Sequence, residues 1–131
     1  MAPSVRTRRI FRELLPAVVD VAPRLICIIA VGEAEDFPAR RDFAMCGLVE
    51  PGTAEIIVAP KIEREPDDVI HALLRHELAH AILLYAGHAD HSEKQADALA
   101  EQLWGDPISY DERDVQTIGP GRRTRPARLH Q

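Results

Sequence analysis

The sequence predicts a small α+β domain with an N-terminal helix, a three-stranded, mainly antiparallel sheet and two C-terminal helices. An amphipathic helical pattern opens the chain, three short apolar segments follow between residues 25 and 59, and two helical patterns fill residues 66–104. Strands grouped together in this way, rather than alternating with helices, are typical of α+β folds. The 131 residues suit one domain, which we place at residues 1–118. Residues 119–131 carry four arginines and almost no apolar side chains, so we expect a flexible basic tail.

The first helix and the first strand follow from local patterns. Residues 7–15 place four apolar side chains on one side and arginines opposite, which predicts an amphipathic helix that Pro16 ends or kinks. Residues 25–31 read Leu-Ile-Cys-Ile-Ile-Ala-Val, and β-branched side chains in such a run predict a buried strand. Because Cys27 and Cys46 have apolar neighbours, we expect both to be reduced core residues.

A hairpin supplies the other two strands. Residues 43–49 and 54–59 flank Glu50-Pro51-Gly52-Thr53, in which proline and glycine hold the positions that a type II turn favours. The second strand ends at Pro60, and proline is tolerated at a sheet edge. Residues 55–60 are therefore either an edge that binds an extended peptide beside the next helix, or an ordinary hairpin arm.

Two helices complete the domain. At residues 66–86, Pro66 suits the first helical position, two aspartates follow at the positive end of the helix dipole, and Gly87 suits the C-terminal cap. Apolar residues lie nearly all round this helix, which predicts a central, buried position. Ser92 suits the N-cap of a second helix that runs to about Trp104 and ends at Gly105.

Composition argues against several classes of protein. With 16 basic and 21 acidic residues, the net charge of −5 disfavours a general nucleic-acid binder. The longest apolar run, residues 25–31, is far shorter than the roughly 18 residues of a membrane span. Charged residues and a proline interrupt the segment after the N-terminal arginines, unlike the apolar region of a secretory signal. We expect a cytoplasmic protein that binds neither nucleic acid nor membrane, and the sequence leaves its oligomeric state open.

Histidines are concentrated in one region, since five of the six lie between His71 and His91. Within it, His76-Glu77-Leu78-Ala79-His80 matches the H-E-x-x-H pattern of zinc-binding helices. Residues i and i+4 of a helix lie one above the other, so His76 and His80 can bind one ion. Glu77 lies about 100° round the helix from His76, close to the ion but off the ligand stripe, where it can act as a general base. His71 lies about 140° away from His76 and is left out of the site.

A catalytic zinc site usually has three protein ligands, so a third is needed here. Glu93 and Asp97 share a face of the second predicted helix. Glu93 can therefore bind the ion while Asp97 accepts the remaining N–H of a ligand histidine. The pattern favours Glu93 and leaves His88, Asp90 and His91 open as alternative ligands. The longer metzincin pattern does not fit, because a leucine and an alanine occupy its glycine and third histidine positions.

The two motifs together resemble a known family. His76-Glu77-Leu78-Ala79-His80 followed by Glu93-Lys94-Gln95-Ala96-Asp97 resembles the gluzincin metallopeptidases, in which a downstream glutamate is the third zinc ligand. The E-x-x-A-D form in so short a chain is most similar to the ImmA/IrrE-type minimal zincins. The resemblance covers about residues 66–105 and implies a zincin-like domain with one Zn²⁺ ion. Thermolysin-like enzymes share the Glu-x-x-x-Asp arrangement, which supports the role given to Asp97.

These residues predict a zinc-dependent metallopeptidase acting on a peptide or protein substrate. Zinc lowers the pKa of its water toward about 7, and Glu77 takes a proton as this water attacks the peptide carbonyl. Tyr110 follows the last helix and is a candidate to stabilise the oxyanion, beside an ordinary packing role. Two alternatives are a zinc-stabilised binding or regulatory module without turnover, and a metallohydrolase of a non-peptide bond.

Overall fold

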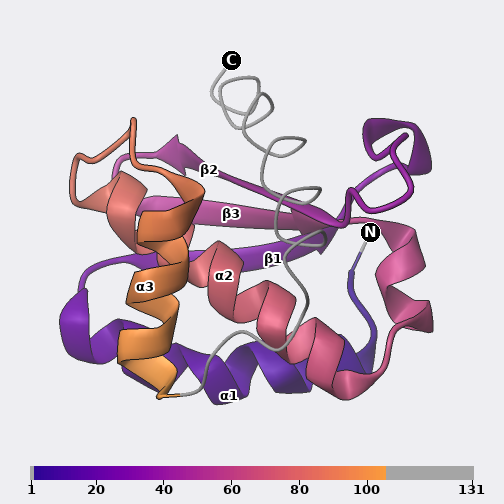
Figure 1. Cartoon of the computed structure of the whole chain (residues 1–131), viewed down its shortest axis with the longest axis horizontal. Helices are drawn as coiled ribbons and strands as arrows, with labels where there is room; N and C mark the ends of the chain where they lie inside the picture. The colour runs from indigo at the N-terminus through magenta and orange to yellow at the C-terminus, as the bar shows by residue number, and fades with distance from the viewer. Residues whose placement is uncertain (1, 106–131) are drawn as a thin grey trace.

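A computed structural model describes residues 2–105 and has the predicted element order α-β-β-β-α-α (Figure 1). The predicted α+β class is confirmed. The elements are α1 (Val5–Val21), β1 (Ile26–Val31), β2 (Ala44–Glu50), β3 (Thr53–Val58), α2 (Asp67–Tyr85) and α3 (Glu93–Trp104), with short 3-10 helices η1 (Ala34–Asp36) and η2 (Pro60–Arg64). Tyr110 and the predicted tail at residues 119–131 lie outside the described residues.

The sheet is mixed and has the strand order β1-β3-β2. β2 and β3 form the predicted antiparallel hairpin, whereas β1 pairs parallel to β3, with Ile29 opposite Ile56. Of the two alternatives for residues 55–60, the structure supports the ordinary hairpin arm, because β3 is the central strand and the edges are β1 and β2. After β1 the chain passes to the opposite edge of the sheet and forms β2 there. It then returns as β3, which lies between β1 and β2.

The first helix continues beyond the proline at which it was predicted to end or kink. α1 runs through Pro16 to Val21, with Leu14 and Val18 buried on one face. A proline inside a helix costs about 3 kcal/mol, and burial of one aliphatic side chain stabilises by about 1.5–3 kcal/mol. The packing of Val18 and of Ala22 behind it therefore offsets the hydrogen bond that Pro16 cannot make.

Polar contacts join the start of α1 to the segment that leads into α2. Ser4 caps α1 by accepting a hydrogen bond from the N–H of Thr7 at 3.2 Å, and its hydroxyl donates to Glu63 at 2.7 Å. Arg6 pairs with Asp67, the first residue of α2, at 3.2 Å. Burial alone would raise the pKa of Glu63, but hydrogen bonds from Ser4 and Thr7 hold this pKa below its ordinary value. These contacts fix the start of α2 against α1.

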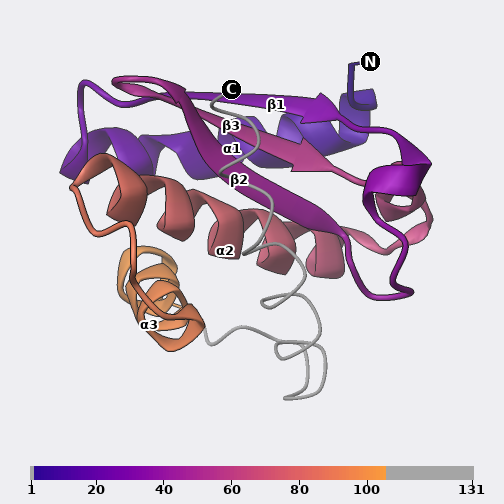
Figure 2. The ribbon, with the colours of Figure 1, turned by 90° about the horizontal axis from the view of Figure 1, so that it is seen from above.

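The central element of the fold is α2. It packs against β2 and β3 of the sheet, against α1, and against α3 on the side away from the sheet (Figure 2). Every residue from Ala72 to Ile82 is buried, as predicted for a helix that is apolar nearly all round. Within residues 2–105, neither α2 nor another helix combines the length and apolar character needed to cross a membrane. Because the middle of α2 is buried, its polar side chains are enclosed by protein.

Both cysteines are thiols that form no disulfide within residues 2–105, as predicted. Cys46 is buried, and Cys27 is partly buried on β1. Burial raises the pKa of the Cys27 thiol to about 11. Because the thiolate is the reactive form, a thiol with so high a pKa is a poor nucleophile, and Cys27 is a packing residue.

Candidate metal centre

Two histidines of α2 lie on the same side of the helix. His76 and His80 are only 1% and 5% exposed. Their rings are nearly perpendicular, with centroids 4.6 Å apart, and their Nε2 atoms are separated by 3.0 Å. The spacing of four residues therefore brings two imidazole nitrogens to one point, as expected for this motif.

The connection after α2 reverses the chain and returns a carboxylate to these histidines. Gly87 follows α2 with a φ of +91°, a left-handed conformation that glycine adopts readily at the end of a helix. Ser92 caps α3, because its hydroxyl accepts a hydrogen bond from the N–H of Gln95 at 3.1 Å. The Gln95 side chain in turn accepts from the N–H of Ser92 at 2.7 Å. Both predicted caps are confirmed, and α3 begins at Glu93.

Small side chains allow α3 to lie close to α2. Ala79 of α2 and Ala96 and Ala100 of α3 form one buried cluster. On a helix, residues three apart are neighbours on one face, so Glu93 and Asp97 lie on the same side as these alanines. The packing of the two helices therefore directs both carboxylates toward the histidines.

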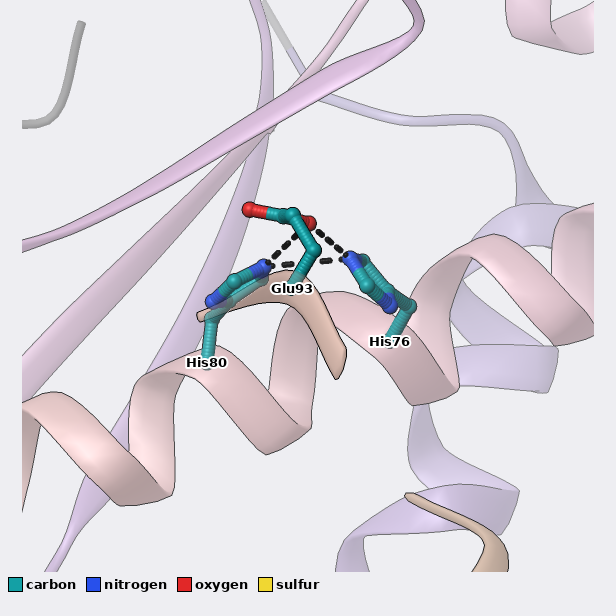
Figure 3. A group of neighbouring side chains, drawn as sticks. All are labelled: His76, His80 and Glu93. Atoms are coloured by element: carbon teal, nitrogen blue, oxygen red, sulfur yellow. Dashed lines mark hydrogen bonds and ion pairs between the residues drawn. The ribbon is translucent and has the colours of Figure 1, made fainter. Parts of the chain in front are cut away.

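Glu93 completes a group of three candidate ligand atoms (Figure 3). Its Oε1 atom lies 2.7 Å from Nε2 of His76 and 3.0 Å from Nε2 of His80. Three atoms at these separations can all lie at the bond length of about 2.0–2.2 Å that histidine nitrogen and carboxylate oxygen make to a zinc-like ion. His76, His80 and Glu93 could therefore hold a metal ion.

Asp97 makes the contact that the sequence predicted for it. Its Oδ1 atom lies 2.5 Å from Nδ1 of His76. A ring N–H on Nδ1 of His76 would donate to this carboxylate oxygen, and the lone pair of Nε2 would then be available to an ion on the side of Glu93. Partners of this kind orient histidine ligands in metal sites.

The alternative third ligands take other positions. The side chains of His88 and Asp90 are exposed in the connection between α2 and α3. His91 is buried, but its Nε2 lies 2.5 Å from Nδ1 of His80, the ring nitrogen that does not contact Glu93. His91 therefore contacts a candidate ligand and does not join the group, and neither does the partly buried His71.

The contact between His80 and His91 is the feature of the site that the sequence reasoning missed. His91 was considered only as a ligand. Its position directly before the cap residue Ser92, in a connection that must fold back on α2, is a signal that could have placed it beside the C-terminal part of the motif.

Glu77 is completely buried next to the histidines. It follows His76 directly, lies three residues before His80, and is 0% exposed. A carboxylate removed from water is stabilised by nearby positive charge. A cation held by the adjacent histidines would supply such charge.

The fold and the site together define a class of protein, an α+β domain whose central helix carries a buried His-His-Glu group that could hold a metal ion. No protein-family model matches the chain, and no curated protein or solved structure matches it. The interpretation of the site therefore depends on the geometry of this chain.

Proposed function

We propose that this protein is a zinc-dependent metallopeptidase of the gluzincin type, similar to the ImmA/IrrE-type minimal zincins. The proposal is carried by the convergence of His76 Nε2, His80 Nε2 and Glu93 Oε1 at separations of 2.7–3.0 Å. Two histidines and a glutamate are one of the ligand sets of catalytic zinc, and this set leaves a coordination position for water or substrate. Imidazole and carboxylate ligands also suit other divalent ions, so the metal itself is part of the proposal.

The residues of the chain then have distinct roles in peptide hydrolysis. When bound, zinc supplies a Lewis acid that polarises the peptide carbonyl and lowers the pKa of water. His76, His80 and Glu93 would hold it, with Asp97 orienting the His76 ring. Glu77 would accept a proton from the attacking water at a carboxylate oxygen and deliver that proton to the leaving amine. The C–N bond breaks in this second transfer, and Glu77 is ionised again for the next cycle.

A peptide substrate has a suitable surface in the edge strand β2. β2 pairs with β3 along one side and packs on α2, the helix that carries the histidines (Figure 2). An extended peptide that added to the other side of β2 would be held through main-chain hydrogen bonds. In this proposal β2, and not the strand at residues 55–60, is the strand that binds substrate.

The complete burial of Glu77 favours a second candidate function, a metal-stabilised binding or regulatory module without turnover. A general base must come within hydrogen-bond reach of the proton that it removes. If Glu77 stays enclosed when the ion binds, the metal would only hold α2 and α3 together.

Glu77→Gln separates the two functions. We expect the purified variant to keep one zinc per chain by elemental analysis and to lose about 10²–10⁴-fold of its hydrolysis rate, the usual contribution of a general base. Activity is measured on unfolded proteins and peptide mixtures by mass spectrometry, with small amides and esters tested in parallel. Glu101→Gln, an exposed change on α3, is the control. Equal cleavage by wild type and Glu77→Gln would refute the role of Glu77, whereas bound zinc without any hydrolysis would support the second function.

A further inference from the structure

We propose that His91 is a positioning residue that fixes which nitrogen of His80 faces the metal ion. The inference depends on the proposed metal centre and assigns a role to a residue outside its three ligands. It comes from a chain of contacts that runs from a backbone carbonyl in the α2–α3 connection, through two buried imidazole rings, to the candidate ligand atoms.

A distance defines each contact in this series. The carbonyl oxygen of His88 lies 2.5 Å from Nδ1 of His91 and also accepts a hydrogen bond from the backbone N–H of His91 at 3.2 Å. Nε2 of His91 lies 2.5 Å from Nδ1 of His80. Nε2 of His80 then lies 3.0 Å from Oε1 of Glu93. His80 and His91 are each only 5% exposed, so bulk water does not replace these contacts.

When a cation occupies the ligand group, Glu93 Oε1 binds the cation and takes no proton from Nε2 of His80, so the position of each proton follows from the acceptor at the other end, the carbonyl oxygen of His88. A carbonyl oxygen accepts hydrogen bonds, so Nδ1 of His91 carries the hydrogen. In a neutral imidazole the other nitrogen is then an acceptor, and Nε2 of His91 must receive the N–H of His80 Nδ1. Nε2 of His80 is left with its lone pair, directed toward Glu93.

The two histidine ligands therefore have the same tautomer for different reasons. Asp97 sets the tautomer of His76 with a carboxylate, and His91 sets that of His80 with a neutral ring. Two nitrogen lone pairs and one carboxylate oxygen then meet at a single point. A cation satisfies all three acceptors together, which is why the contact of His91 with His80 favours metal binding.

Three variants test this role through metal affinity. His91→Phe keeps a ring of similar size but removes the acceptor, and we expect zinc to bind about 10- to 100-fold more weakly, as when such outer partners are lost. His91→Gln returns an acceptor oxygen at a similar reach and should recover most of the affinity. His88→Ala is the matched control in the same connection, because it changes an exposed side chain and keeps the carbonyl. Dissociation constants come from competition with a chromophoric chelator, and visible spectra of the cobalt-loaded proteins report the ligand geometry.

The zinc affinities of the His91 variants and of the wild type separate the possible outcomes. Weak binding by His91→Phe with recovery in His91→Gln supports the proposal, whereas unchanged affinity in His91→Phe, or equal loss in both variants, overturns it. If wild type binds no zinc or cobalt, the metal centre of the proposed function fails and this inference fails with it. If wild type binds zinc and only the His91 comparison fails, the proposed function is untouched.

A measurement on the wild-type protein avoids any variant that fails to fold. Imidazole nitrogen NMR of the zinc-loaded chain distinguishes protonated, unprotonated and metal-bound ring nitrogens. We expect His80 to be protonated at Nδ1 and metal-bound at Nε2, and His91 to be protonated at Nδ1 with a metal-free, unprotonated Nε2. A proton or a metal ion on Nε2 of His91 would overturn the proposal.

Discussion

Replacing Glu93 with glutamine tests the metal centre most directly. The change keeps the shape of the side chain but exchanges a charged oxygen ligand for a neutral amide. Glu93 is the one carboxylate of the ligand group found within residues 2–105, and its Oε1 lies within 3.0 Å of both Nε2 atoms. Asp97 contacts Nδ1 of His76, on the opposite side of the ring from Nε2, and is not part of this group. Glu93→Gln should therefore remove metal binding and leave the fold.

The size of the effect follows from linkage between binding and folding. At a free metal concentration of about 100 times Kd, binding stabilises the folded state by about 2.7 kcal/mol. For a domain of about 100 residues, each kcal/mol moves the unfolding midpoint by about 4–8 °C, so metal should raise the wild-type midpoint by about 10–20 °C. If loss of the carboxylate weakens binding by about 1,000-fold, the same metal concentration stabilises Glu93→Gln by less than about 0.1 kcal/mol.

Thermal unfolding followed by circular dichroism measures this, with each protein scanned in zinc and in chelator. Glu101→Gln is the control for a lost carboxylate on the same helix and should keep the full metal-dependent shift. In chelator, Glu93→Gln should unfold close to the wild type, since the change leaves the packing of α3 on α2 intact. A metal-dependent shift in Glu93→Gln equal to that of the wild type would refute the assignment of Glu93 as a ligand.

Two further predictions concern the caps and the charges that support the site. Ser92→Ala removes the N-cap of α3 and should lower the free energy of unfolding in chelator by about 1 kcal/mol, measured by urea denaturation. It should also weaken zinc binding, because Glu93 is the next residue. Ser4→Ala, which uncaps α1, should cost similar stability without changing zinc affinity, and equal weakening by both variants would contradict this reasoning. Glu63→Gln should be less stable than wild type at pH 7. The pKa of Glu63 is lowered from 4.5 by folding, so its contribution is present above that value and lost as pH falls through the folded pKa. The difference in stability between wild type and Glu63→Gln should therefore shrink toward pH 3. A difference that does not change with pH would contradict the assigned contribution of the ionised Glu63.

The features that the sequence predicted well depend on neighbouring residues. The i and i+4 histidines, the Gly87 terminus and the Ser92 cap each need only a few residues to form. The all-round apolar pattern of residues 66–86 also led directly to the central position of α2, because no surface helix could bury it. The face shared by Glu93 and Asp97 was predictable for the same local reason.

The features that were missed depend on residues far apart in the chain. β1 pairs with β3 across the hairpin, and no local pattern specifies which side of a hairpin a preceding strand joins. α1 continues through Pro16 because Val18 finds a place in the core, which is a tertiary effect. The contact of His91 with His80 likewise requires the path of the connection between the helices, which its residue types do not define.

The burial of polar groups in the middle of α2 is itself an argument for a metal ion. His76, Glu77 and His80 are at most 5% exposed, where polar groups reduce stability unless each is compensated. In the tautomers proposed above, Asp97 and His91 receive the outward N–H groups of the two histidines, and the lone pairs of both Nε2 atoms point inward. Glu93 Oε1 adds a third acceptor, and three acceptor atoms cannot hydrogen-bond to one another, because none of them carries a proton. A divalent cation would satisfy all three atoms and offset the charge of Glu93, so binding of a metal ion would stabilise this buried cluster.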